Sequence, residues 1–308
     1  MIPRSGKRET LRKSCYGGAM RVHLVDGTFE LYRAHFAPRP GHRAPDGRDI
    51  KATVGLVASL AALLRDPEEG VTHLAVAFDN PIRSFRNDLF PAYKSDEGVP
   101  PELRSQFDSA ERAVAALGVV VWSMREFEAD DALATAARRF SGAAEQVRIL
   151  SPDKDLGQCL RADTVVQVDR IRRKTIDLDA FRVRWGIEPT SMPDLLALVG
   201  DSADGLPGVP GFGLKTAAAL LARYVHLDEI PLDGTAWPSE VRGAKRLSAA
   251  LREHLEAARL YRRLATLRDD VPLEEDLEVL RYRGPSAGWA QWCEETGRPE
   301  WRDLASMR

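Results

Sequence analysis

The chain has 308 residues, of which 44% are hydrophobic and 29% are charged, a balance typical of a globular protein with about two domains. No apolar run of roughly 18 residues or more occurs, which argues against a membrane span. The formal net charge of −2 argues, taken alone, against a polyanionic partner.

The first residues of the chain and its cysteines say little about function, but they bear on the cellular compartment and on the kind of metal expected. Residues 1–19 are polar and basic and lack the apolar stretch of a secretion signal, so we expect either a disordered leader or a start upstream of the natural one at Met20. Cys15, Cys159 and Cys293 are widely spaced, and the six histidines form no zinc motif. The pattern favours a reducing cytoplasm and excludes zinc from the expected metals.

Short β-branched runs alternate with helical periodicity along the first two thirds of the chain. Strands are predicted, in order, at Val22–Val25, Leu74–Phe78, Val119–Trp122, Val147–Leu150 and Val165–Val168. Helices are predicted between them at Thr53–Leu64, Glu102–Leu117 and Asp130–Phe140. This alternation indicates a parallel sheet with helices on both faces.

The pattern changes after about residue 190, where strands stop. The predicted helices there, separated by glycine and proline, are Pro193–Val199, Leu214–Tyr224 and Ala244–Leu267. We therefore expect an α/β domain over residues 20–190 and an all-α domain over residues 191–308. In the tail, Trp289, Trp292 and Trp301 are expected to pack in a core.

Acidic residues recur where the predicted strands end. The nine are Asp26, Asp79, Glu128, Asp130, Asp131, Asp153, Asp155, Asp201 and Asp204. The carboxyl ends of parallel strands line one crevice, so these side chains are expected to converge. Any one of them is more often a helix or turn cap, and Asp130 with Asp131 also suits a helix dipole.

Taken together, the nine acids predict bound cations. Two like charges ~4 Å apart repel by about 4 kcal/mol at an effective dielectric near 20, so a crevice of carboxylates needs positive charge to stay ionised. Oxygen ligands suit Mg²⁺ or Mn²⁺, and a pair of such ions holds both oxygens of an in-line phosphoryl displacement. The rest of the chain is net basic, which suits a phosphodiester polymer.

Residues 200–217, GDSADGLPGVPGFGLKTA, place two of the acids directly before a run of turn residues and a predicted helix from Leu214. The stretch is either a solvated linker or the junction between two halves of an active site. Glycines allow close backbone approach, and free N–H groups at a helix start bind phosphate, so we favour the junction.

Five ordered segments carry a resemblance to a known family. They are VDGTFELYRAHFA, FD…FR…YK, EADD, SPDKDLGQ and LVGDSADGLPGVPGFGLKTA, within residues 20–275. Together they resemble the bacterial 5′–3′ exonuclease and flap-endonuclease family, which includes the N-terminal nuclease domain of bacterial DNA polymerase I. The resemblance implies a PIN-like α/β nuclease domain, a helical arch around residues 80–117, and a following helix–three-turn–helix (H3TH) DNA-binding domain.

The resemblance also implies ligand sets and residue roles. Asp26, Asp79, Glu128 and Asp130, with Asp131 in the same cluster, would form one metal group, and Asp153, Asp155, Asp201 and Asp204 the second. Two or more Mg²⁺ or Mn²⁺ ions are expected, with K⁺ at the H3TH hinge. Lys94 and Arg86 would approach the scissile phosphate. Implied DNA contacts are Tyr32, Arg33, Tyr93, Gly208, Gly211, Gly213, Lys215 and Thr216. The alternative is that Arg86 and Lys94 are solvated and that Tyr93 packs locally.

Two departures from the family pattern affect substrate contacts. Asp96 and Glu97 stand where an arginine usually follows the lysine, and Arg104 is the candidate replacement. Gly205 stands where asparagine is usual.

The resemblance implies a monomeric, metal-dependent nuclease for DNA with a 5′ flap, a nick or a free 5′ end. A catalytically quiet DNA-structure-binding protein and an RNA-directed PIN-type ribonuclease are the alternatives.

Overall fold

A six-stranded sheet organises the first domain in the computed structural model, which describes residues 20–303; the leader expected at residues 1–19 lies outside them. The strands are β1 (Arg21–Asp26), β2 (His73–Asp79), β3 (Val120–Met124), β4 (Gln146–Leu150), β5 (Val165–Asp169) and β6 (Lys174–Ile176). Their order is β3-β2-β1-β4-β5-β6, with only β6 antiparallel to its neighbour. All five predicted strands are confirmed, whereas β6 has three residues and was missed.

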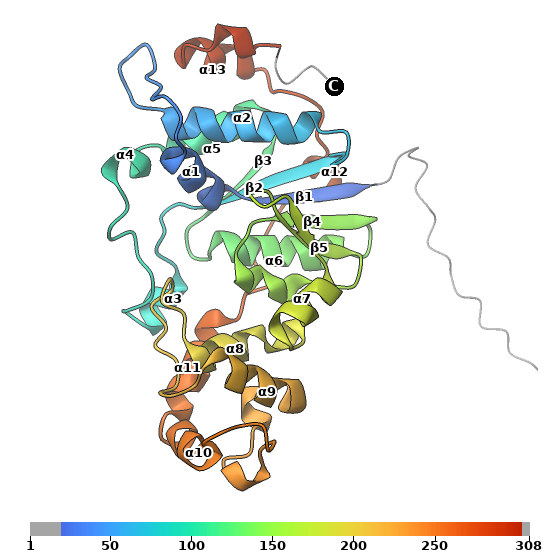
Figure 1. The fold of residues 1–308 in the computed structure, drawn as a ribbon. Helices are drawn as coiled ribbons and strands as arrows, with labels where there is room; N and C mark the ends of the chain where they lie inside the picture. The colour runs from blue at the N-terminus through green and yellow to red at the C-terminus, as the bar shows by residue number, and fades with distance from the viewer. Residues whose placement is uncertain (1–19, 304–308) are drawn as a thin grey trace, which may run out of the picture.

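Helices cover both faces of the sheet because successive strand residues point to opposite sides. Val25 and Phe78 pack against α1 (Gly27–Phe36), α2 (Lys51–Arg65) and α5 (Phe107–Ala116). Leu24 and Ala77, one position earlier on the same strands, pack instead against α6 (Ala129–Phe140). Figure 1 shows α2 and α5 above the sheet and α6 below it.

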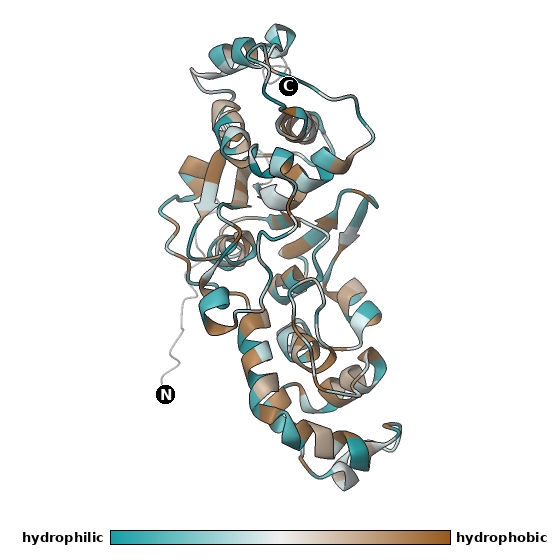
Figure 2. Ribbon diagram, turned by 90° about the vertical axis from the view of Figure 1, so that its left-hand side faces the viewer, coloured by the Kyte–Doolittle hydropathy of each residue, from teal (hydrophilic) through white to brown (hydrophobic). Residues whose placement is uncertain are grey.

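The second domain is helical, as predicted. Its main helices are α8 (Met192–Val199), α9 (Leu214–Tyr224), α10 (Ala244–Glu253) and α11 (Leu255–Ala265), and α7 (Leu178–Trp185) precedes them. The single helix expected over Ala244–Leu267 is two helices that meet at His254. Most helices carry hydrophobic residues along one side and hydrophilic residues along the other (Figure 2), which is why they pack into a shared core.

The helical arch expected around residues 80–117 is not a continuous helical element. The segment holds α3 (Phe85–Leu89) and the short α4 (Pro101–Arg104), and the helix predicted over Glu102–Leu117 is broken before α5. At the break, the buried Gln106 side chain accepts a hydrogen bond from Thr53 N at 3.1 Å. That contact joins the start of α5 to α2, and α5 packs in the core of the α/β domain.

The C-terminal tail returns to the first domain, which corrects the expectation that residues 191–308 form one helical unit. Tyr282 N donates to Thr72 O at 3.0 Å beside β2, after α12 (Leu277–Leu280). In α13 (Trp289–Glu295), the rings of Trp289 and Trp292 stack with centroids 5.0 Å apart in the core formed with α5. The prediction that the tryptophans pack is confirmed, and α13 lies at the opposite end of the molecule from α10 (Figure 1).

No helix in the described part of the chain is both long enough and apolar enough to cross a bilayer.

A polar cluster links β1, β4 and the turn before β2, and we expect it to make stability depend on pH. His23 Nε2 lies 3.1 Å from Glu69 Oε2, and Arg148 Nε donates to the same oxygen at 2.9 Å. Burial lowers the pKa of His23, although the hydrogen bond with Glu69 opposes this shift. The hydrogen bond from His23, together with the positive charge of Arg148, lowers the pKa of Glu69 to about 2.

Replacing Glu69 with glutamine is therefore expected to cost about 1–2 kcal/mol at pH 7, because two donors lose a charged acceptor. A lowered carboxyl pKa contributes stability above the ordinary value of 4.5 and loses it as pH falls toward about 2. The difference in urea midpoint between wild type and Glu69→Gln should shrink across that window. Glu68→Gln, on an exposed neighbour, is the control, and a pH-independent difference would contradict the linkage.

Candidate active site

Five of the predicted acids meet in one crevice at the carboxyl ends of the strands. Its lining includes Asp26, Asp79, Asp130, Asp153 and Asp204, and its volume is about 700 Å³. Asp26 and Asp79 are the last residues of β1 and β2, and Asp130 lies in the first turn of α6. Asp204 lies in the segment that follows α8, so both domains contribute acids to the lining of the crevice.

Several of these acids cap the start of a helix or turn with one carboxylate oxygen, which leaves the second oxygen for metal coordination. Asp26 Oδ1 accepts from Phe29 N at 2.8 Å at the start of α1. Asp79 Oδ1 accepts from Ala129 N at 2.7 Å, and Asp153 Oδ1 accepts from Asp155 N at 2.9 Å. Asp153 Oδ2 accepts no hydrogen bond from the residues that the structure describes. Capping and ligation are thus compatible roles for the same side chain.

The remaining acids of the predicted second group lie beside the crevice. Asp155, Asp201 and Asp204 each offer an oxygen, and these atoms lie within 4.8 Å of one another. Asp155 Oδ1 is buried without a hydrogen-bond partner. A buried carboxylate oxygen without a donor is costly unless a cation or water satisfies it, so the residues fit a divalent metal.

Several carboxylates at and beside the crevice resist ionisation in the protein alone. Burial, followed by repulsion from Asp79 and Asp153, raises the pKa of Asp26 to about 7. Burial and neighbouring carboxylates also raise the pKa of Asp79, Asp130, Asp155 and Asp204. Because a bound cation favours the ionised form, the crevice should take up metal and release protons together.

Lys94 lies at the crevice, as the resemblance implies. Its Nζ is 2.9 Å from Glu128 Oε2 and 3.5 Å from Asp204 Oδ1. Although burial lowers it, the charge of Glu128 holds the pKa of Lys94 well above its usual value. The backbone N–H of Lys94 donates to Asp204 O at 3.2 Å, which fixes the lysine against the stretch after α8.

Arg86 and Asp131 do not face the crevice, which corrects two sequence predictions. Arg86 is only 1% exposed, and its two terminal nitrogens donate to the two Asp131 oxygens at 2.7 Å each. Arg86 Nε also donates to Leu264 O at 2.7 Å. In this structure the pair joins α3, α6 and α11, and neither side chain is available to a phosphate or a metal.

Of the aromatic and arginine residues predicted to contact DNA, some are packed or paired within the protein and one lines the crevice. Tyr93 is only 5% exposed, packs in the core of the helical domain, and has its hydroxyl 3.4 Å from Glu128 Oε2, so no ring face is free for a base. Arg33 is paired with Glu30 and donates to Ser59 Oγ at 2.8 Å. Tyr32, by contrast, lines the crevice. The interpretation of local packing therefore holds for Tyr93.

Residues that were not singled out as site residues also line the crevice. Lys154, between two acids of the DKD sequence, and Arg184 of α7 both do so. The DKD spacing could have drawn attention to Lys154, whereas no local pattern marks Arg184. Arg104 is paired with the Asp96 carboxylate and donates from Nη2 to Asp96 O at 3.0 Å. It therefore neutralises the negative charge of Asp96, one of the two acids that replace the arginine usual after Lys94.

Residues 200–217 form a packed junction and not a linker. Asp201 and Leu206 exchange backbone hydrogen bonds of 2.8 and 2.7 Å, which closes a tight loop. A Cβ on Gly205 would lie 2.4 Å from Ala92 O, and its φ is +73°, so asparagine would not fit here without movement.

The second half of the junction leads into α9 through left-handed glycines. Gly208 and Gly211 have φ of +73° and +85°. Gly213 precedes α9, and Lys215 in its first turn is exposed, with Thr216 half-buried beside it. These residues present a helix start and a cation to solvent, as phosphate binding would require.

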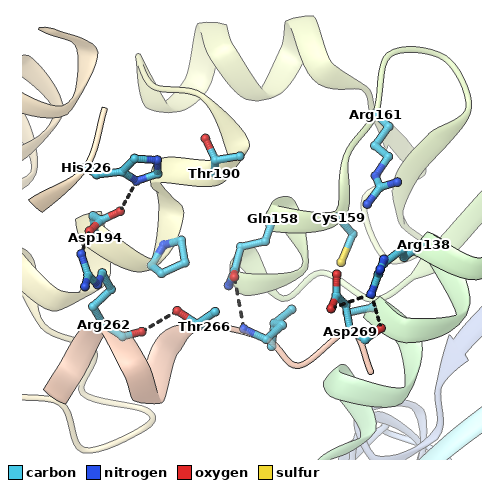
Figure 3. A pocket seen from close by; sticks show the side chains of 13 residues that line it. Arg138, Gln158, Cys159, Arg161, Thr190, Asp194, His226, Arg262, Thr266 and Asp269 are labelled. Carbon is cyan, nitrogen blue, oxygen red and sulfur yellow. Dashed lines mark hydrogen bonds and ion pairs between the residues drawn. The ribbon is translucent and has the colours of Figure 1, made fainter. Parts of the chain in front are cut away.

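A second cavity, of about 480 Å³, is lined by residues of both domains and by none of the nine predicted acids (Figure 3). Asp194 there is 2% exposed and accepts from Leu227 N at 3.0 Å, with His226 Nδ1 also 3.0 Å away. Asp269 is paired with Arg138 at 3.1 Å. Both carboxylates have partners, and among the described residues no group of three metal-ligating side chains meets in this cavity.

Comparison with known proteins agrees with this geometry. Residues 21–186 match the family model for the N-terminal resolvase-like domain of 5′–3′ exonucleases, and residues 187–288 match the model for their C-terminal SAM fold. The chain belongs to the 5′–3′ exonuclease family. Members are metal-dependent hydrolases of the exonuclease and flap-endonuclease type.

Relatives of this member of the 5′–3′ exonuclease family include much longer proteins. DNA polymerase I of Rhizobium leguminosarum is 41% identical over 265 residues, which are 84% of this chain and 26% of the polymerase. DNA polymerase I of Bacillus caldotenax is 35% identical over 270 residues, covering 86% and 30% of the two chains. The chain therefore spans less than a third of the length of these two relatives.

Solved structures show the same fold at low sequence identity. The D15 protein of phage T5, crystallised with metal ions, superposes with a TM-score of 0.63 at 18% identity, covering 80% of this chain and 89% of that one. The catalytic core of Rad2 in complex with DNA gives 0.60 at 13% identity, covering 94% and 92%. The PIN-like α/β domain with a helical second domain is thus confirmed as the fold of this 5′–3′ exonuclease family member.

Proposed function

We propose that this chain hydrolyses phosphodiester bonds of DNA near 5′ ends, at flaps, nicks or free 5′ ends. The observation that carries the proposal is the crevice in which carboxylates from both domains converge beside Lys94. Neighbouring acids with raised pKa values favour a bound cation, and the stretch of chain that supplies Asp204 leads on to the exposed start of α9 with Lys215.

The residues present would hold two divalent ions. Asp26, Asp79 and Asp130 would supply one site, and the group of Asp155, Asp201 and Asp204 the other. When bound, such ions lower the pKa of a coordinated water and neutralise charge on the phosphate. Because all these donors are carboxylates, Mg²⁺ or Mn²⁺ fits better than zinc.

The protein's own groups would orient the substrate. Lys94 would place its ammonium against the scissile phosphate, and Tyr32 would face the terminal nucleotide within the crevice. The start of α9, with Gly213 and Lys215, would bind a duplex phosphate at a fixed distance from the acids. K⁺ at the Gly208–Gly211 hinge, a monomeric state and a cytoplasmic location remain predictions from the resemblance and the composition.

The test combines metal removal with loss of the second acidic group. EDTA should abolish cleavage of a labelled 5′-flap DNA, and Asp155→Ala with Asp201→Ala should lower turnover by roughly a thousand-fold or more. Binding in low salt should persist, because removing carboxylates reduces repulsion with DNA. The matched control is Asp179→Ala, whose side chain is 91% exposed on α7. Unchanged turnover in the double variant would refute the assignment of the second group.

The same assay separates the alternatives. A catalytically quiet DNA-binding protein would bind the flap without cutting it in Mg²⁺ or Mn²⁺. An RNA-directed nuclease would cut single-stranded RNA in preference to flap DNA.

A further inference from the structure

Lys154 occupies a position at the second acidic group that the proposed reaction does not use. It lies between Asp153 and Asp155, in the turn after β4. Its Nζ donates to Asp201 Oδ2 and lies 3.5 Å from Asp155 Oδ1. The Lys154 side chain is 32% exposed, so it reaches the acids from the open side of the crevice.

Two of the three acids that would hold the second ion therefore already have a cation. Asp201 is paired with the ammonium, and Asp155 Oδ1 lies 3.5 Å from the same nitrogen without making a hydrogen bond. The third acid, Asp204, lies 3.5 Å from Lys94 Nζ. An incoming divalent ion would need the Asp201 oxygen that Lys154 holds, and it would be repelled by the ammonium at close range.

We propose that Lys154 is a built-in counter-cation, which a divalent ion must displace from Asp201 before the second site fills. Lys154 would thereby stabilise the metal-free crevice and weaken the affinity of the second site. This inference rests on the proposed metal centre. The flexible stem of this partly exposed side chain allows the displaced ammonium to move toward solvent or toward a substrate phosphate.

The sign of the effect distinguishes this role from a merely structural one. If Lys154 only held the acids in place, its removal would disorder them and weaken metal binding. If Lys154 competes with the ion, its removal frees Asp201 and leaves the acids more repulsive to one another. Metal binding would then become tighter, while the metal-free protein would become less stable.

The experiment measures Mn²⁺ binding to the full chain without DNA, by electron paramagnetic resonance and by the thermal shift that Mn²⁺ produces. Lys154→Met is expected to bind the weaker of two Mn²⁺ ions roughly tenfold more tightly than wild type, because one close positive charge is removed. In EDTA its melting temperature should be lower than that of wild type. Lys154→Arg keeps the charge and should resemble wild type, and Lys174→Met, on the exposed face of β6, is the matched control.

Unchanged or weaker Mn²⁺ binding in Lys154→Met would overturn the proposal. If Lys154→Met does not fold without metal, Lys154→Gln, which keeps a hydrogen-bond donor to Asp201, gives the same comparison. Wild-type protein that binds two Mn²⁺ ions but leaves flap DNA uncut would refute the proposed function and not the role of Lys154. Wild-type protein that binds only one ion would overturn the role of Lys154 whatever its activity.

Discussion

Replacing Arg86 with alanine is expected to lower the free energy of unfolding by about 3–5 kcal/mol, the usual cost of leaving one member of a buried ion pair alone. Asp131 is 0% exposed and would keep a charge without its two 2.7 Å donors. Leu264 O would lose its donor from Arg86 as well. Urea unfolding monitored by circular dichroism measures this loss.

The experiment also decides between two roles for Arg86. Arg83→Ala is the matched control, since Arg83 is 68% exposed in its pair with Asp88 and should cost less than about 1 kcal/mol. Arg86→Ala and Asp131→Ala should show strong coupling in a double-mutant cycle. A variant with wild-type stability and greatly reduced cleavage would instead support contact with the scissile phosphate and would contradict the structural role.

Replacing Lys94 with methionine is expected to lower turnover on flap DNA by about 100- to 1,000-fold, the usual effect of removing one preorganised stabilising group from an active site. Lys94 Nζ is positioned by Glu128 at 2.9 Å and Asp204 at 3.5 Å, so it is held at the crevice before substrate arrives. Single-turnover cleavage in saturating Mg²⁺ measures the chemical step.

The control for Lys94 has to separate the loss of a positive charge at the crevice from the loss of a positive charge elsewhere on the protein. Lys174→Met removes an exposed lysine on β6 and should leave turnover unchanged. In Lys94→Met, Glu128 loses one cation but keeps Arg86 Nη1 at 3.4 Å and a hydrogen bond from Ser84 Oγ at 2.6 Å. Its charge therefore stays compensated, and the variant should still fold. A fall in duplex affinity with an unchanged single-turnover rate would show that Lys94 only binds the substrate.

Local patterns predicted the elements of this protein well. The runs at Val22–Val25 and Leu74–Phe78 are strands because buried parallel strands need continuous apolar residues, a property of short segments. Their terminal acids, Asp26 and Asp79, meet because parallel strands end at one edge of a sheet. The position of the crevice therefore followed from the order of the elements.

Other features depended on contacts that no local pattern records. Glu102–Leu117 has helical periodicity throughout, yet it breaks where Gln106 is tied to Thr53 of another helix. The tail was assigned to the helical domain, but it returns to β2 and α5 because apolar surface there needs cover.

The sequence by itself determined the α/β and helical domains, the family and the strand-end acids, since each depends on residue type and spacing. Only the tertiary structure decided which charged side chains face the crevice. Arg86 looks like a phosphate ligand beside Lys94, but its partner Leu264 lies 178 residues further along the chain. Whether a side chain is buried or exposed is set by such distant neighbours, because the cost of removing a charge from water depends on what surrounds it.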